Sequence, residues 1–119
     1  MRNEIKEDEL DIASKNAMQI IMAAGDARVC CNEALSAIEE NDMETAQKKI
    51  EDADKKIAEA HHIQTEAIQG EIAGEKREYN LLFAHAQDTL MTIYSEIHMT
   101  KKLIKIFESI EKRLEKLEK

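Results

Sequence analysis

No proline occurs among the 119 residues of this chain, and glycine occurs only three times. Proline removes a backbone hydrogen-bond donor, and glycine costs about 1 kcal/mol relative to alanine inside a helix, so these residues are the usual helix breakers. The other residues are dominated by Ala, Glu, Lys, Ile, Leu and Met, a composition typical of helical proteins. The sequence therefore predicts an all-α fold.

Apolar residues recur at helical spacing and define a first helix from about residue 7 to residue 40. Gly25 lies in the middle of this helix, where we expect it to mark a close approach to another helix rather than a helix end. Asn41, followed by Glu44, has the spacing of a capping box at the start of a second helix, and Asp42 is the alternative cap.

The second helix is expected to end near Gly70 and Gly74, which are C-terminal signals. A third helix should then run from about Lys76 to the end of the chain. Short connections between three long helices predict an antiparallel up-down-up three-helix bundle, with residues 1–119 as a single domain.

The third helix carries two stripes, one apolar and one partly polar. The apolar stripe is expected to form a single coiled-coil-like core seam, and the methionines of the chain are expected to fill the core. The partly polar stripe indicates contact with something besides the other two helices, and a core of small side chains favours self-association. The apolar stripe comprises Phe83, Leu90, Ile93, Ile97, Ile104, Phe107, Ile110, Leu114 and Leu117, and the partly polar stripe comprises Leu81, Asp88, Ser95 and Lys102.

The charge and the two cysteines restrict the class of protein. A net charge of −8 argues against binding to nucleic acid, because that affinity depends on neutralising phosphates with Lys and Arg. No apolar run approaches the roughly 20 residues that span a bilayer, and the N-terminus is too acidic for a secretory signal. Cys30 and Cys31 are adjacent, so small reduced thiols are expected rather than a disulfide. A cytoplasmic protein is predicted.

A short segment of the third helix, residues 85–89, places an acid and a base on one flank. A neutral imidazole such as that of His85 can act as nucleophile, general base or ligand. A carboxylate such as Asp88 is costly in a packed seam unless it is paired, protonated or bound to a cation. Three copies of Asp88 on a three-fold axis would favour Mg²⁺ or Ca²⁺. The plain alternative for both residues is ordinary polar surface.

A different chemistry is suggested by Glu59 and His62, which form the Glu-x-x-His pair of carboxylate-bridged di-iron bundles. Such a site needs two of these pairs, and the other histidines lack a glutamate three residues before them. Polar helix surface is therefore the better interpretation of this pair. A non-catalytic helical oligomerisation module, whose polar seam sets the register, is the remaining alternative to a catalytic role for the chain.

The segment HAQDTLM, residues 85–91, resembles a pattern that one protein family carries in its third helix. The family pattern is His-Ala-Gln-Asp-His-Leu-Met, matched at all positions but one, and residues 23–35 and 60–75 resemble the family's first and second helices. On these segments the chain is identified as a member of the enzyme IIA components of the lactose/cellobiose class. These proteins belong to the bacterial phosphoenolpyruvate-dependent sugar phosphotransferase system.

The resemblance implies a homotrimer of three-helix subunits that acts as a phosphotransferase. His85 would accept a phosphoryl group from the phosphocarrier protein HPr and pass it to a cysteine of the IIB component. IIB then phosphorylates a disaccharide during its uptake through the membrane component IIC. The transfer requires no cofactor, while Asp88 would lie at the trimer axis and share a divalent cation, Mg²⁺, with its two copies. Gln87 and Thr89 would donate hydrogen bonds to the phosphoryl oxygens.

Thr89 is the one departure from the family pattern, which has a second histidine at this position. A hydroxyl group can donate a hydrogen bond to a phosphoryl group, but it cannot carry a positive charge. The transferred group brings about −1.5 to −2 charges, by analogy with other phosphorylated side chains. The substitution therefore bears on the rate of transfer and on the lifetime of the phosphorylated state, while the acceptor His85 is retained.

Overall fold

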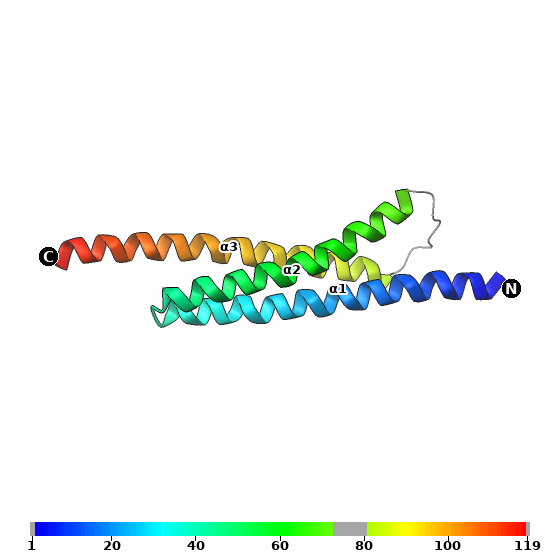
Figure 1. The fold of residues 1–119 in the computed structure, drawn as a ribbon, viewed down its shortest axis with the longest axis horizontal. Coiled ribbons are helices and arrows are strands. Elements are labelled where there is room, and N and C mark those ends of the chain that lie inside the picture. Colours follow the sequence, from blue (N-terminus) through cyan, green and yellow to red (C-terminus); the bar gives the residue numbers. More distant parts are fainter. Residues whose placement is uncertain (1, 73–80, 119) are drawn as a thin grey trace.

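The computed structural model describes residues 2–72 and 81–118, and the side chains within 12–70 and 81–118. It contains three helices, α1 (Arg2–Glu39), α2 (Met43–Ile72) and α3 (Leu81–Glu118), and no strand within these residues. α2 runs antiparallel to α1 and α3, and the molecule is an elongated rod with extents of 77 × 22 × 18 Å (Figure 1). The predicted all-α, up-down-up three-helix bundle is confirmed.

The core of the bundle is built mainly from alanine and isoleucine. Small side chains along α1 and α2 allow the helix backbones to approach closely, and α3 covers the seam between them with larger side chains. The predicted apolar spacing of the first two helices is confirmed within the described side chains. The most deeply buried large side chains are Ile20, Ile50, Leu90, Ile93 and Ile104.

Two expectations about the core are wrong. Gly25 does not mark a close approach between helices of one chain, because a Cβ atom built on it would meet nothing within 4 Å. Four described methionines (Met18, Met22, Met91 and Met99) do not fill the core either: Met22 on α1 is 65% exposed and Met99 on α3 is 63% exposed. The reason is that alanine and isoleucine already occupy the closely spaced interior, so longer side chains are left on the outer faces.

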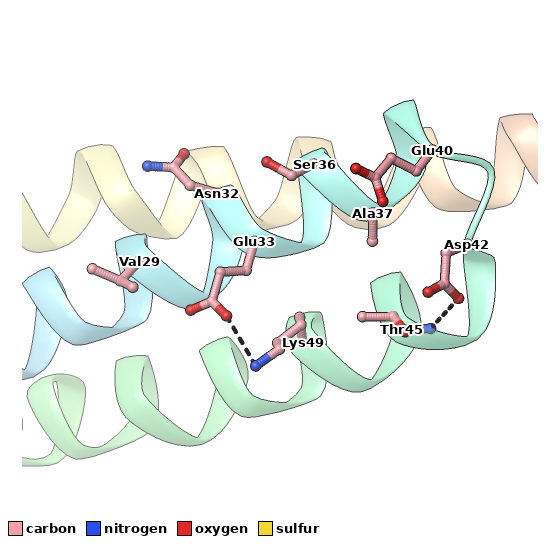
Figure 2. Close-up of a pocket in the computed structure, with 9 residues that line it drawn as sticks. All are labelled: Val29, Asn32, Glu33, Ser36, Ala37, Glu40, Asp42, Thr45 and Lys49. Atoms are coloured by element: carbon pink, nitrogen blue, oxygen red, sulfur yellow. Dashed lines mark hydrogen bonds and ion pairs between the residues drawn. The ribbon is translucent and has the colours of Figure 1, made fainter.

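The α1–α2 turn shows which of the two proposed caps is used. Asp42, and not Asn41, caps α2, since the Thr45 amide donates a hydrogen bond to Asp42 Oδ1 at 3.1 Å (Figure 2). Hydrogen bonding from Thr45 also holds the pKa of Asp42 below its ordinary value. Asn41 ends α1 instead, with a φ of 60°. The amides of Asn41 and Asp42 bond to the carbonyls of Ile38 and Ala37, which is a Schellman motif.

The helix bounds differ from the predicted ones at two places. α1 already begins at Arg2, and α2 passes through Gly70 and continues to Ile72. A single glycine lowers helix propensity by about 1 kcal/mol, which the surrounding good helix formers outweigh. The predicted end signal Gly74 and the predicted helix start at Lys76 lie outside the described residues.

The apolar stripe predicted for the third helix is divided in the structure. Its first part packs into the bundle, where Leu90 and Ile104 are buried, whereas Leu114 and Leu117 are exposed. Figure 1 shows the reason, since the C-terminal end of α3 projects past the α1–α2 turn. Within the described residues, no helix combines the length and apolar character that crossing a membrane requires.

Candidate functional site

His85 lies in the second turn of the described part of α3, and its side chain is exposed. The helix register explains this position, because Ala86 and Leu90 are both buried and turn the opposite side of the helix toward α1 and α2. Among the described residues, the imidazole makes no hydrogen bond or ion pair. A ring nitrogen is therefore free to attack a group presented from outside the chain.

Asp88 lies one turn after His85 on the same flank, as predicted, and is also exposed. Its carboxylate makes no hydrogen bond or ion pair with the described residues. Exposed apolar side chains lie on the outer side of α3 before and after it in the sequence, including Leu81 and Met91. A single chain thus presents an unpaired carboxylate on an outer face of α3 that also carries exposed apolar side chains.

Thr89 lies one turn after His85, and its side-chain hydrogen bond goes to the backbone of His85 and not to the imidazole. Thr89 Oγ1 donates a hydrogen bond to the backbone carbonyl of His85 at 2.9 Å, one turn earlier in the helix. Thr92 makes the same bond to the carbonyl of Asp88, also at 2.9 Å. The Thr89 hydroxyl hydrogen is therefore already committed to the backbone.

Gln87 is half-buried and lies on the other side of α3 from His85. Two positions along a helix correspond to a rotation of roughly 200° about its axis. The structure therefore brings His85, Asp88 and Thr89 to one side and leaves Gln87 away from them.

An ion pair that sequence reasoning missed joins α1 to α3 on the His85 side of α3. Arg28 donates two hydrogen bonds to the Glu96 carboxylate, at 3.0 and 2.8 Å, and these bonds raise the pKa of Arg28. Glu96 follows His85 by eleven positions, or about 16 Å along the helix, so the pair does not reach His85 within one chain. The two partners lie 68 residues apart, and no local pattern in the sequence connects them.

Both cysteines are free, as predicted, and Cys31 lies near this ion pair. Cys31 is buried with its Sγ 3.2 Å from Thr100 Oγ1, and Cys30 is half-buried. Burial raises the pKa of Cys30, which lowers its thiolate fraction at neutral pH. Neither thiol has the surroundings of an activated nucleophile.

The Glu59 and His62 pair lies on the exposed surface of α2. His62 Nε2 is 3.2 Å from Glu66 Oε1, and both side chains are largely exposed. Within the described part of one chain, no group of three His, Cys, Asp or Glu side chains is placed to hold a metal ion. A polar helix surface accounts for this pair.

Four hollows of the bundle are lined by described residues, and His85 is not among the residues that line them. One of about 450 Å³ lies between α1 and α2 near their turn, and the Glu33–Lys49 ion pair of 2.9 Å crosses it (Figure 2). This bond raises the pKa of Lys49. None of the residues 85–89 lines this hollow. His85 is thus an exposed nucleophile on the surface of α3, which suits reaction with a group held by another protein.

Comparison of this sequence with known proteins identifies a family and several relatives. Residues 15–108 match the family described as "PTS system, Lactose/Cellobiose specific IIA subunit". The lichenan-specific phosphotransferase enzyme IIA component of Bacillus subtilis is 44% identical over 92 residues, which are 77% of this chain and 84% of the relative.

Two solved structures have the same fold. The cellobiose-specific enzyme IIA of Bacillus anthracis superposes with a TM-score of 0.78 at 36% identity, over 83% of this chain and 91% of that one. The IIA(Chitobiose) protein of Escherichia coli, solved in complex with HPr, has a TM-score of 0.69 at 26% identity, over 83% and 96% of the two chains.

Proposed function

Since this chain belongs to the lactose/cellobiose-specific IIA family of the sugar phosphotransferase system, we propose that His85 accepts a phosphoryl group from HPr and passes it to the cysteine of a IIB component. The exposed imidazole without a bonding partner is the observation that carries this proposal. The structure of the chitobiose relative in complex with HPr supports HPr as the donor. The membrane component IIC is then an indirect partner.

The proposed reaction is two successive in-line displacements at phosphorus. A lone pair of the neutral His85 imidazole forms a nitrogen–phosphorus bond while the bond between phosphorus and HPr breaks. The IIB thiolate then forms a sulfur–phosphorus bond as the bond to His85 breaks. Both steps depend on positioning, which the helical backbone of α3 supplies for His85.

Thr89 and Gln87 could donate hydrogen bonds to the phosphoryl group on His85 only under particular geometric conditions. Thr89 can donate to a phosphoryl oxygen only after its hydroxyl turns away from the carbonyl of His85. Gln87 lies on the opposite side of its own helix and would have to act on a neighbouring copy. Under this proposal much of the charge stabilisation comes from the docked partner or from a second copy.

We also propose that the chain assembles as a homotrimer through the outer face of α3. The exposed apolar side chains around Asp88 support this assembly, since water-exposed apolar surface of this kind favours association. Three Asp88 carboxylates would meet at the axis, and a divalent cation such as Mg²⁺ would relieve their repulsion. The cation would hold subunits together and would not take part in the transfer.

The test of the phosphocarrier is intact-mass spectrometry after incubation with phosphoenolpyruvate, enzyme I and HPr. We expect an acid-labile gain of one phosphoryl group on the wild type and on His98→Ala, and none on His85→Ala. His98 is a matched control because it is another exposed histidine of α3. Full phosphorylation of His85→Ala would disprove the assignment. No gain on any protein, with HPr itself phosphorylated, would favour the non-catalytic helical module.

The Asp88→Leu variant tests the proposal that three Asp88 carboxylates share a cation at the trimer axis. We expect it to remain trimeric by light scattering, because leucine fits the apolar face, and to lose any bound divalent cation by metal analysis. Asp26→Leu, an exposed aspartate on α1, is the control. Monomers of Asp88→Leu under conditions where the wild type is trimeric would contradict this view of the axis.

The proposal leaves the choice of sugar to IIB and IIC. The relatives described above are named for lichenan, cellobiose and chitobiose. We propose a β-linked disaccharide as the class of substrate of the complete system. Growth tests with the cognate IIB and IIC components would identify it.

A further inference from the structure

The C-terminal part of α3 concentrates basic residues in a chain that is acidic as a whole. Residues 101–118 contain six Lys and Arg residues against four Glu residues, whereas the whole chain contains 17 Lys and Arg residues against 25 Asp and Glu residues. Figure 1 shows the end of this segment projecting past the α1–α2 turn. A positively charged segment on an acidic chain attracts anions to one place on the surface.

Four of these basic residues lie around one hollow of about 390 Å³ on the side of α3, which we name the basic hollow. All of its lining residues follow Ile104, the last buried residue of α3. The basic hollow is lined by Lys105, Glu108, Ser109, Lys112, Arg113 and Lys116. Sites for small molecules have volumes of roughly 300–1,000 Å³, so this hollow has the size for a small ligand.

The basic side chains of the hollow differ from those of the bundle in having no carboxylate partner. Basic side chains that join two helices of the bundle lie 2.6–2.9 Å from a carboxylate oxygen; these pairs are Arg28 with Glu96, Lys49 with Glu33 and Lys101 with Asp54. Among the described residues, no such pair involves the four basic side chains of the hollow. The spacing explains this for Arg113 and Lys116, because the positions three and four residues away from them hold no carboxylate. Their charges are therefore available to a ligand from outside the chain.

The glutamates of this segment are mostly directed away from the hollow. Glu111 follows Ser109 by two positions and Glu118 follows Lys116 by two positions, which corresponds to a rotation of roughly 200° about the helix axis. Glu108 is the one carboxylate at the edge of the basic hollow, and it also lines a neighbouring hollow together with Met43 at the start of α2. The helix thus separates its positive side from most of its negative charges.

A hydroxyl group adds a neutral donor to these charges. The hydroxyls of Thr89, Thr92 and Thr100 each donate to the backbone carbonyl one turn earlier in α3. The hydroxyl of Ser109 makes no hydrogen bond with the described residues, so its hydrogen is available in the basic hollow.

We propose that the basic hollow binds a small free anion that carries phosphate groups. The guanidinium of Arg113 presents parallel N–H donors that match two oxygens of one phosphate group, and Lys112 and Lys116 supply point charges beside it. Several cations around one hollow favour a ligand with two or more negative charges over a single carboxylate. Ser109 follows His85 by 24 positions, or about 36 Å along the helix, so this site is separate from the proposed phosphoryl acceptor and does not rest on it.

The charge of the chain favours a free anion over the phosphate groups of a membrane. Anionic lipids attract clusters of Lys and Arg, but they repel a chain with a net charge of −8. The volume of the hollow also suits a small molecule better than a segment of another protein.

The first test is a titration of the wild-type chain with pyrophosphate at constant ionic strength, followed by NMR. We expect saturable shifts of the backbone amide signals of Ser109 and Arg113, and no saturable shift of Lys49, which lines a different hollow. Inorganic phosphate carries fewer charges and should bind at least about tenfold more weakly. Shifts that do not saturate, or that are equal throughout the chain, would overturn the proposal.

The second test compares two double variants that each remove two positive charges. Arg113→Gln with Lys116→Gln changes the basic hollow, while Lys48→Gln with Lys55→Gln changes two exposed positions of α2 and is the matched control. We expect the first to weaken pyrophosphate binding by at least about tenfold and the control to leave it unchanged. Circular dichroism checks that both keep their helices. Equal weakening in the two would show that only the net charge matters and would overturn the site.

The third test identifies the source of the anion. Sedimentation with phosphatidylglycerol vesicles and titration with poly-glutamate offer the wild-type chain a lipid surface and an acidic polypeptide. We expect the chain to stay in the supernatant with the vesicles and to show no saturable binding of poly-glutamate. Sedimentation with the vesicles would assign the phosphate groups to lipid, and saturable binding of poly-glutamate in place of pyrophosphate would assign the hollow to an acidic protein. Either result would overturn the proposal of a small free anion.

Discussion

The two parts of α3, residues 81–104 and 105–118, share an apolar repeat and differ in what becomes of it. In the first part Leu90 and Ile93 are buried against α1 and α2, while in the second part Leu114 and Leu117 face solvent. The side chains are of the same kind, and only the neighbouring helices differ. An apolar repeat thus predicts a helix that needs a partner, and the length of α1 and α2 decides where that partner lies within the chain.

The sharpest contrast between the two parts should come from one pair of substitutions. Leu90→Ala removes a fully buried side chain, and we expect it to lower the free energy of unfolding by about 2–5 kcal/mol. Leu114→Ala, at low protein concentration where copies are separate, should change it by less than about 0.5 kcal/mol. Urea unfolding followed by circular dichroism measures both. Similar losses would show that the C-terminal end of α3 packs within its own chain.

A smaller difference in the free energy of unfolding is expected between substitutions of Arg28, in the bundle, and Arg113, in the projecting end of α3. Arg28→Met breaks the bidentate ion pair with Glu96, whose side chains are each 42% exposed, so we expect a loss of no more than about 1 kcal/mol. Arg113→Met, in the projecting end, should have no effect on the separate chain. A double-mutant cycle with Glu96→Gln isolates the pair, and high salt should reduce its coupling. A coupling free energy that salt does not reduce would contradict this assignment.

The contribution of the α1–α2 turn to the stability of the folded chain should depend on pH. Hydrogen bonds from Thr45 lower the pKa of Asp42, so its ionised form stabilises the folded chain above the ordinary carboxyl pKa of about 3.9. This contribution is lost as the pH falls through the lower, folded-state value. We expect Asp42→Ala to lower the melting temperature by a few degrees at pH 7, and the difference from wild type to shrink on acidification. A difference that stays constant down to pH 2 would contradict the titration of this cap.

The smallest effect is expected for a substitution of Thr89, measured as the rate at which His85 is phosphorylated. Thr89→Val removes a hydroxyl that bonds to the backbone carbonyl of His85, so the rate of phosphorylation should change by less than about threefold. Loss of a donor that stabilises a transition state typically costs about 100-fold or more. Rapid-quench mass spectrometry of Thr89→Val and of the control Thr92→Val measures the rates. A 100-fold loss in Thr89→Val alone would show that this hydroxyl changes partner during transfer.

Much of the fold could be predicted because it depends on local properties. The absence of proline and the spacing of residues such as Ala17, Ile20 and Ala24 predict helices with one buried side. The cap of α2 was predicted only as an alternative, because Asn41 and Asp42 are both good candidates and the left-handed conformation of Asn41 decides between them. Gly25 lies within α1 as predicted, but its interpretation as a close approach between helices of one chain was wrong. A glycine at a helix contact and a glycine at a helix surface look the same in a sequence.

The arrangement of the candidate site along the helix could also be predicted, but the hydrogen-bond partners of its side chains could not. Helical spacing places His85, Asp88 and Thr89 on one side of a helix, and the structure agrees. The partner of the Thr89 hydroxyl could not be predicted, because a side-chain donor one turn after a carbonyl can choose between that carbonyl and an external group. Their catalytic roles remain proposals that the phosphorylation experiments test.

The sequence by itself determined that the chain is helical, that the first break lies at residues 41–42, and that His85 and Asp88 share a flank, because these properties depend on backbone propensity and on a period of 3.6 residues. Only the tertiary structure decided that Arg28 reaches Glu96, that Met22 and Met99 face outward, and that the apolar stripe of α3 is buried in one part and exposed in the other. Burial is a relation between segments that are distant in the chain, and it exists only where another helix lies alongside.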